Sequence, residues 1–250
     1  MNNLPENNSH IDTIHIKDKL EQLGISLDDI NLGNFDYIGE YTAKKMRAQN
    51  SENWRKVGAF FRPNYERGVL IYSLIKKYNI KSVLEIGFGR GYGTFCAAMA
   101  MEETGGGKVT TVDPKMDHDH IRQLKNVFPP TWFDMVTFIE TTSNGFLPHL
   151  GEDDNYDLVY IDGDHTYNGV KYDWENTKDH FNKFLLFDDY HLPSKVEDND
   201  IECAALINEI EDDSKELIIM DRRMFKDDRG LPDDEIDYGQ VLITHESLRK

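Results

Sequence analysis

Residues 83–94 read VLEIGFGRGYGT, and this stretch decides how the chain folds. The first four residues are apolar except for Glu85, which suits a short strand buried in a sheet. Glycine then occupies every second position from Gly87 to Gly93, and an almost continuous apolar run follows over residues 95–101. A strand, a tight glycine turn and a closely packed helix form the arrangement by which α/β proteins hold a nucleotide-like ligand against bare backbone.

The spacing of these glycines argues against a dinucleotide site, whose third glycine would fall where Tyr92 stands. The pattern resembles instead motif I of the class I S-adenosylmethionine-dependent methyltransferases. The resemblance implies that Glu85 orients the methionine part of the cofactor while the loop lies against it. The predicted cofactor-binding residues of this segment are Glu85, Gly87, Gly89, Gly91, Tyr92 and Thr94. The alternative is a glycine-rich turn without a ligand.

Composition limits the class of protein. The chain has 250 residues, of which 39% are hydrophobic and 30% charged, as expected for a soluble globular domain with additions. No apolar run could span a bilayer, and the N-terminus does not resemble a signal peptide. A net charge of −18 argues against nucleic acid as a partner, and two cysteines indicate a reducing compartment. We therefore expect a cytoplasmic protein with no nucleic-acid or membrane partner, for which a homo-oligomer is compatible with the sequence.

One segment departs from this acidic balance. Between residues 44 and 67 there are seven basic residues and only two acidic ones. The basic residues are Lys44, Lys45, Arg47, Arg55, Lys56, Arg62 and Arg67. Such a patch is consistent with a solvated helical face, or with a wall of the active site that meets a polar or anionic substrate.

The chain divides into an Asn-rich tail over residues 1–10, a helical N-terminal extension over 11–61, and a main domain over 62–250. Within the extension, helices are expected at 16–23 and 41–47. The main domain shows strand patterns at 83–86, 108–112, 135–140, 157–161, 183–187, 216–220 and 240–244, and helical patterns at 62–78, 121–127, 169–181 and 201–210.

The alternation of strands and helices predicts an α/β fold with a parallel sheet covered by helices on both faces. The last two strands have no helix between them, so we expect the final strand to be antiparallel. Together with the resemblance described above, this implies a Rossmann-like, class I methyltransferase fold with a mostly parallel sheet of seven strands. Its second strand ends in Asp113, about 20 positions past the loop, where a carboxylate can accept hydrogen bonds from ribose hydroxyls.

Two further apolar strands end in acidic residues. Residues 157–161 lead into Asp162, and residues 183–187 lead into Asp188 and Asp189. Asp-Asp pairs recur in polar parts of this chain, so the dipeptide alone means little; what distinguishes this pair is the buried strand before it. Because the carboxyl ends of parallel strands share one edge of the sheet, these carboxylates are expected to gather and to suit Mg²⁺. The alternative is a set of carboxylates held by backbone and solvent.

The segments YDLVYIDGDHTYNGVKYDWE and FLLFDDYH sharpen the resemblance. They are similar to the small-molecule O-methyltransferases that include the macrocin-type sugar enzymes, the cephalosporin-hydroxylase-like proteins and the methyltransferase-24 group. The resemblance implies Mg²⁺ ligands at Asp162, Asp188 and Asp189, a cofactor contact from Asp162, and an adenine contact from Ser143. The Pro-Gly-Gly turn usual before the last of these strands is replaced by residues 182–184.

His165 lies three residues after Asp162, where metal-dependent relatives of the catechol type carry a basic lysine. Imidazole titrates near neutral pH, so His165 is predicted as the catalytic base. Asp164 is the competing candidate, and a helix cap is the structural alternative for His165.

The sequence therefore predicts methyl transfer from S-adenosylmethionine to a hydroxyl of a small molecule, such as a sugar or a natural-product glycoside, assisted by a divalent metal. Two alternatives stay open: a metal-dependent hydrolase that uses the acidic cluster, and a non-catalytic adapter that retains the fold.

Overall fold

Eight strands in the described part of the chain form a single sheet in the order β1-β7-β8-β6-β5-β2-β3-β4. The computed structural model describes residues 11–31, 34–35, 38, 65–191, 202–221 and 238–249. Its strands are β1 (Asp12–His15), β2 (Ser82–Ile86), β3 (Lys108–Val112), β4 (Val136–Ile139), β5 (Tyr156–Ile161), β6 (Phe181–His191), β7 (Glu216–Ile219) and β8 (Tyr238–Thr244). The predicted tail over 1–10, the helix at 41–47 and the basic residues Arg47, Arg55 and Arg62 lie outside the described residues.

The sheet is parallel except at β8, which runs antiparallel to both β6 and β7 in the described part of the chain. This confirms the predicted return of the final strand. From β2 the chain continues to β3 and β4 on one side, whereas β5 pairs with the other side of β2. The order of the strands therefore reverses between β2 and β5, and open α/β sheets bind ligands at such a reversal, beyond the carboxyl ends of the strands.

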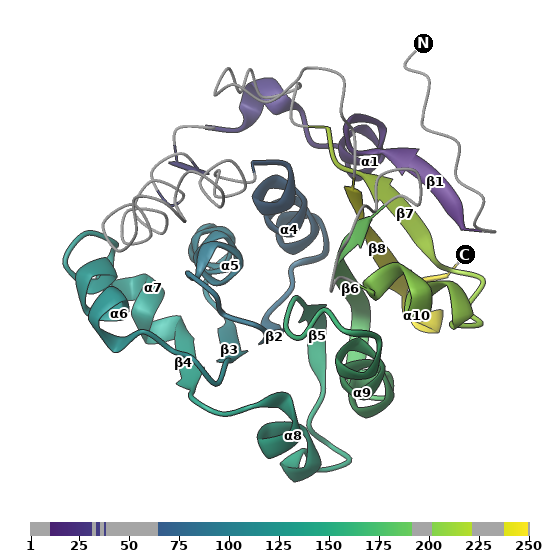
Figure 1. Ribbon diagram of the computed structural model, residues 1–250. Coiled ribbons are helices and arrows are strands. Elements are labelled where there is room, and N and C mark those ends of the chain that lie inside the picture. The colour runs from purple at the N-terminus through teal and green to yellow at the C-terminus, as the bar shows by residue number, and fades with distance from the viewer. Residues whose placement is uncertain are drawn as a thin grey trace, which may run out of the picture.

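Helices cover both faces of the sheet (Figure 1). The described helices are α1 (Ile16–Leu23), α4 (Tyr65–Tyr78), α5 (Tyr92–Glu103), α6 (His118–Lys125), α7 (Pro130–Met135), α8 (Ser143–Phe146), α9 (Tyr167–Thr177) and α10 (Cys203–Glu209), with 3₁₀ turns at Leu27–Asp29, Leu147–His149 and Glu246–Leu248. Helices α1, α4 and α5 pack in one apolar core, and α9 and α10 pack in the other.

Strand residues alternate between the two cores, as the pleat of a strand requires. In β5, Leu158 and Tyr160 belong to the core of α4, and Val159 and Ile161 belong to the core of α9. Leu186 of β6 likewise faces the α4 core. This parity decides on which side of the sheet the residues just after each strand project.

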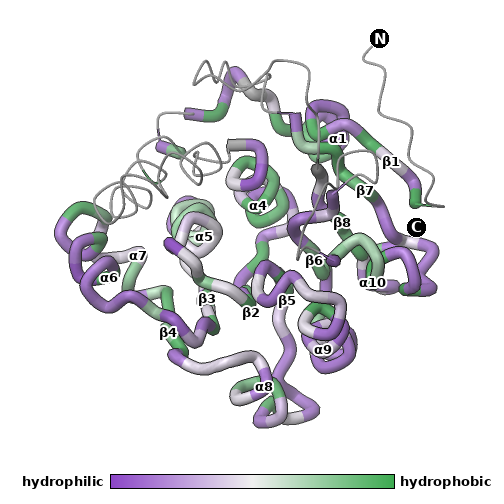
Figure 2. Tube along the Cα trace, viewed as in Figure 1, coloured by the Kyte–Doolittle hydropathy of each residue, from purple (hydrophilic) through white to green (hydrophobic). Residues whose placement is uncertain are grey.

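Helix α5 is buried on all sides, with every residue from Thr94 to Met101 buried. In Figure 2 its tube is pale to green, whereas much of α6 is purple. A helix enclosed in this way must have small or apolar side chains all round, which explains the continuous apolar run that follows the glycines. No helix in the described ranges combines the length and hydropathy needed to cross a bilayer.

The N-terminal part differs from the prediction of a wholly helical extension. Residues Asp12–His15 form β1, which extends the sheet to eight strands by parallel pairing with β7. Helix α1 has the predicted bounds, and its residues Leu20 and Leu23 join the core of α4. A four-residue strand with little alternation of polarity is stabilised by its tertiary partner, so its own sequence carries little signal.

Strand β6 also differs, because it continues to His191 and contains the acidic pair expected beyond its end. Its pairing with β5 stops at Phe187, but pairing with β8 resumes at Tyr190 after a register shift. Asp188 and Asp189 thus form an irregularity within the strand.

Candidate active site

The glycine loop between β2 and α5 packs against the turn that follows β5. Gly87 has φ 99°, and a Cβ atom there would lie 2.0 Å from the carbonyl oxygen of Asp162. The Asp162 N–H donates to the carbonyl oxygen of Ile86 over 2.8 Å. A side chain at position 87 would therefore separate the two segments, which is the physical reason for glycine.

Gly89 is different, because a Cβ atom there would meet nothing within 4 Å among the described residues, although its φ is 52°. Its N–H donates to Asp113 Oδ2 over 3.0 Å, and the Lys115 N–H donates to Oδ1 over 2.7 Å. Asp113 is thus fixed beside the open face of the loop. A ligand that contacts bare backbone at Gly89 would also reach this carboxylate.

Glu85 lies beneath the loop and is buried. Its Oε2 atom accepts hydrogen bonds from the hydroxyls of Thr94 and, over 2.6 Å, Thr111. Burial raises the pKa of Glu85 to about 8, although the two hydroxyls lower it in part. The Glu85 and Thr94 side chains therefore support the loop from below, and the predicted contact of each with a cofactor stays a prediction.

Two other predicted cofactor residues occupy the edge of this region. Tyr92 is the first residue of α5 and follows Gly91, the N-terminal cap of that helix. Ser143 is the first residue of α8, whose cap is Thr142. Both are partly buried, and their contacts with a cofactor remain predictions.

The acidic cluster forms on the α4 side of the sheet. Tyr160 faces α4, so Asp162, two residues later, projects to the same side, and Asp188 follows Leu186 in the same way. The Tyr160 hydroxyl lies 2.6 Å from Asp188 Oδ2 and 3.2 Å from Asp162 Oδ2. Two strand ends thus bring these carboxylates together, as the sequence predicts.

Asp189 would point to the opposite side if β6 were regular. Its φ is 49°, a left-handed conformation that is uncommon for a residue other than glycine. The register shift of β6 falls at this position, and it brings Asp189 Oδ1 within 3.5 Å of Arg67 Nη2. Strained backbone of this kind is frequently found at functional sites.

Arg67 reaches the cluster from the first turns of α4 and contacts all three carboxylates. Its Nη2 atom lies 2.7 Å from Asp188 Oδ2, and its Nη1 atom lies 3.4 Å from Asp162 Oδ2. Gln240 of β8 completes the surroundings of Asp188 by donating from Nε2 to Oδ1 over 3.1 Å. The predicted metal ligand Asp188 is therefore a buried counter-ion of Arg67.

His165, rather than Asp188, completes the group of side chains around Asp162 and Asp189. Its buried Nε2 atom lies 3.4 Å from Asp162 Oδ1 and 3.3 Å from Asp189 Oδ2. One ligand atom each from Asp162, His165 and Asp189 lie within 4.8 Å of one another. The three converging atoms therefore belong to two of the predicted metal ligands, Asp162 and Asp189, and to the predicted base, His165.

The pKa values of these side chains are shifted because the charged groups lie so close together. Burial and the neighbouring Asp188 raise the pKa of Asp162 to about 7, and burial also raises the pKa of Asp189. The adjacent Asp162 carboxylate raises the pKa of His165 to about 9. Without a cation, His165 is therefore protonated at neutral pH and holds its proton among carboxylates.

Asp164 takes no part in the cluster. Its Oδ1 atom accepts from the Thr166 N–H over 3.0 Å, and its side chain packs against Gly169 of α9. A carboxylate bound to the start of the following helix is a turn residue, so the structure disfavours the prediction that Asp164 competes as base.

The sequence assigns no site role to Tyr160 or Gln240. Arg67 appears there only as one of seven basic residues in a patch that is either a solvated face or a wall of the active site, and Tyr160 reads as one more residue of an apolar strand. Gln240 could have been recognised in the sequence, because it is a polar residue directly before the apolar run VLI, and the structure shows that it is buried. Buried amides generally have a polar partner, and here the partner is Asp188.

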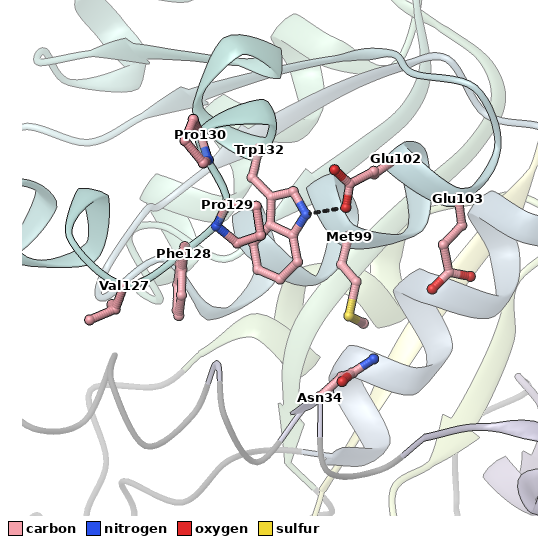
Figure 3. A pocket seen from close by; sticks show the side chains of 9 residues that line it. All are labelled: Asn34, Met99, Glu102, Glu103, Val127, Phe128, Pro129, Pro130 and Trp132. Atoms are coloured by element: carbon pink, nitrogen blue, oxygen red, sulfur yellow. Dashed lines mark hydrogen bonds between the residues drawn. The ribbon is translucent and has the colours of Figure 1, made fainter.

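A separate cavity of about 500 Å³ lies near the C-terminal end of α5, where Met99, Glu102 and Trp132 line it (Figure 3). The glycine loop is at the opposite end of this 12-residue helix, about 15 Å away at 1.5 Å per residue. The Trp132 Nε1–H donates to Glu102 Oε2 over 2.9 Å, so the polar groups of this cavity already pair with each other.

A glycine loop, the Asp113 carboxylate and acidic strand ends lie together at the reversal of the sheet, where open α/β folds bind ligands. The family comparison agrees: residues 84–190 match the model described as "Methyltransferase domain". Residues 84–190 are thus similar to a methyltransferase domain, and the sheet has the Rossmann-like fold of the class I methyltransferases. The matched segment includes the loop, all three aspartates and His165, whereas Arg67 and Gln240 lie outside it.

Solved structures share the fold. An O-methyltransferase from Bacillus cereus, in complex with S-adenosylhomocysteine, is 14% identical with a TM-score of 0.53, over 86% of this chain and 100% of that one. The O-methyltransferase TomG from Streptomyces achromogenes, involved in tomaymycin synthesis and solved with S-adenosylmethionine, is 11% identical with a TM-score of 0.51, over 85% of this chain and 97% of that one. The comparison with curated protein sequences gave no match.

Proposed function

We propose that this protein transfers the methyl group of S-adenosylmethionine to a hydroxyl oxygen of a small molecule, at a site completed by a divalent cation. One observation carries the proposal: the turn that bears Asp162 is packed directly on the glycine loop at Gly87. A cofactor lying against that loop is therefore adjacent to the acidic cluster. The two solved structures described above are both named O-methyltransferases, which supports transfer to oxygen.

The reaction is an in-line displacement in which the acceptor oxygen attacks the methyl carbon. A carbon–oxygen bond forms, the carbon–sulfur bond breaks, and S-adenosylhomocysteine leaves as a neutral thioether. The chain contributes mainly by holding the acceptor oxygen in line with the sulfonium and by removing the hydroxyl proton. The open space at Gly89 and the fixed carboxylate of Asp113 would hold the adenosyl part.

The donor set fits a divalent cation. The buried Nε2 atom of His165 lies between two carboxylate oxygens, so Asp162, Asp189 and His165 would hold the ion. When bound, the cation would lower the pKa of the acceptor hydroxyl and fix its position. Oxygen-rich sites with one or two carboxylates suit Mg²⁺, and an imidazole ligand also suits Mn²⁺.

The role of His165 has two forms that experiment can separate. To act as a base, His165 must be neutral. In the cation-free protein the neighbouring carboxylates raise its pKa and so favour the protonated form. As a ligand it presents the same neutral nitrogen to the ion. The position of its Nε2 atom between Asp162 and Asp189 supports the ligand role.

The proposal is tested by incubating the protein with S-adenosylmethionine, Mg²⁺ and a panel of hydroxylated small molecules, and measuring S-adenosylhomocysteine formation. Sugars and glycosides are the first acceptors to try, because of the resemblance to sugar O-methyltransferases. We expect turnover that EDTA abolishes and Mg²⁺ or Mn²⁺ restores. Calorimetric titration with S-adenosylhomocysteine is the second readout, and no binding at millimolar ligand would refute the proposal.

A matched pair of variants assigns His165. We expect His165→Ala to weaken Mn²⁺ binding and to lower kcat by a factor on the order of 10²–10⁴, with cofactor affinity nearly unchanged. Asp164→Ala removes a neighbouring charge outside the cluster and is expected to leave Mn²⁺ affinity unchanged. If His165 is a base but not a metal ligand, His165→Ala would lower kcat without changing Mn²⁺ affinity.

We infer a reducing, cytoplasmic location from the two cysteines, Cys96 and Cys203, which are both buried thiols. The strongly acidic net charge supports the absence of a nucleic-acid partner.

A further inference from the structure

Arg67 occupies the centre of the acidic cluster. Its two terminal nitrogens reach three carboxylates: 2.7 Å to Asp188, 3.4 Å to Asp162 and 3.5 Å to Asp189. The Arg67 side chain is only 16% exposed. One guanidinium thus supplies a fixed positive charge at the place where a divalent cation is expected.

The three carboxylates are not equivalent partners of Arg67. Asp188 is fully buried, and its oxygens also accept from Tyr160 over 2.6 Å and from Gln240 over 3.1 Å. Asp162 and Asp189 are about one-fifth exposed and lie at the longer distances. A buried ion pair with additional hydrogen bonds is costly to separate, whereas the two looser contacts can be exchanged for contacts to a cation.

We propose that Arg67 is the resident cation of this site: it keeps Asp188 out of the metal coordination and thereby sets the affinity for the divalent ion. The inference rests on the cation site proposed above and adds which residues bind the ion and which do not. The cation is held by Asp162, Asp189 and His165, while Arg67 and Asp188 form a neutral pair behind them.

The number of protein ligands decides how many coordination positions are left for the acceptor. Six coordination positions are usual for Mg²⁺, so three protein ligands leave positions for water and for the acceptor hydroxyl. A fourth ligand from Asp188 would remove one of these positions. By neutralising Asp188, Arg67 also reduces the negative charge that holds the ion, which favours a moderate affinity.

The test is a Mn²⁺ titration followed by the loss of the electron paramagnetic resonance signal of the free ion. Asp188→Asn should weaken Mn²⁺ binding on the order of tenfold, because the positive charge of Arg67 is then uncompensated beside the site. Arg67→Met combined with Asp188→Asn removes both charges of the pair. This double variant should bind Mn²⁺ within about threefold of the wild type.

One control accompanies the pair. Lys76→Met removes one positive charge from the same helix, at a residue paired with Glu103 and 32% exposed, and should have no effect. Circular dichroism and thermal unfolding establish that each variant is folded; in the double variant Asp162 and Asp189 still have His165 beside them.

The opposite result identifies Asp188 as a ligand: the double variant would then bind Mn²⁺ as weakly as Asp188→Asn or more weakly, and the inference is overturned. If the wild type binds no Mn²⁺, the cation site and this inference both fail. Methyl transfer is judged separately, by S-adenosylhomocysteine binding and formation.

Discussion

Gly87 and Asp162 meet backbone to backbone, so closely that a Cβ atom on Gly87 would lie 2.0 Å from the Asp162 carbonyl oxygen. The first residue belongs to the glycine loop and the second to the turn that bears the acidic cluster. Their contact lies at the reversal of strand order between β2 and β5. The glycine loop and the proposed cation site are therefore in direct contact, and each can be tested through its own residues.

We expect Gly89→Val to abolish S-adenosylhomocysteine binding while the fold survives. The Cβ atom meets nothing in the described structure, but a branched side chain fills the space where the cofactor would lie. The left-handed φ of 52° adds a stability cost of about 1–2 kcal/mol. Calorimetry with S-adenosylhomocysteine measures the affinity.

Gly105→Val is the matched control for Gly89→Val. Gly105 has φ 88° and an equally open Cβ position, but it lies beyond the C-terminal end of α5. We expect a similar loss of stability and an unchanged affinity. Equal affinities for the two variants would contradict the assignment of the loop.

Asp113→Ala should lower S-adenosylhomocysteine affinity by a factor on the order of 10–100. A hydrogen bond to a charged group contributes about 1.5–3 kcal/mol, and the ribose would lose its acceptor. Asp119→Ala is the control, because Asp119 is a 68% exposed carboxylate of α6 whose charge is removed in the same way. If both variants bind equally well, Asp113 does not contact the cofactor.

Asp173→Asn should stabilise the protein by about 1 kcal/mol at pH 8 and have no effect at pH 4. Asp173 of α9 is buried. Burial raises the pKa of Asp173 from 3.8 to about 6, although a hydrogen bond with the Ser143 side chain lowers it in part. The folded state therefore binds the proton more tightly than the unfolded state, and stability falls as pH rises between these values.

Urea unfolding of the wild type and Asp173→Asn at pH 4 and pH 8 measures this difference. A variant that is less stable at pH 8 would show that the carboxylate has a partner when ionised.

The cation-free protein should lose stability as the pH rises from about 6.5 to about 9. The pKa of His165 is raised from 6.5 to about 9, mainly by the Asp162 carboxylate. Its stabilising charge is fully present below pH 6.5 and is lost as the pH passes 9, with a change on the order of 2 kcal/mol. The raised pKa of Asp162 acts in the same direction at lower pH, between 3.8 and about 7.

His165→Gln should flatten the upper part of this profile, because glutamine does not titrate. The measurement is the urea midpoint from pH 6 to pH 9 in EDTA, for the wild type and the variant. Parallel profiles would mean that another group causes the change.

Much of the fold follows from local sequence pattern. The apolar run before Gly87 and the glycines after it specify a strand, a turn and a helix, because each depends on residues a few positions apart. The bounds expected for β3 and α1 agree with those observed, and the strands before Asp162 and Asp188 were located for the same reason. β1 was missed, since its stability comes from pairing with β7, about 200 residues away.

The sequence by itself determined that a glycine loop and acidic strand ends share one edge of the sheet. Only the tertiary structure decided which of those groups point at one another. Asp189 turns toward the cluster because β6 pairs irregularly with β8, and Asp188 is neutralised by Arg67, which is 121 residues earlier in the chain. Side-chain contacts over such separations depend on how helices and strands pack, and the local periodicity of the sequence does not contain that information.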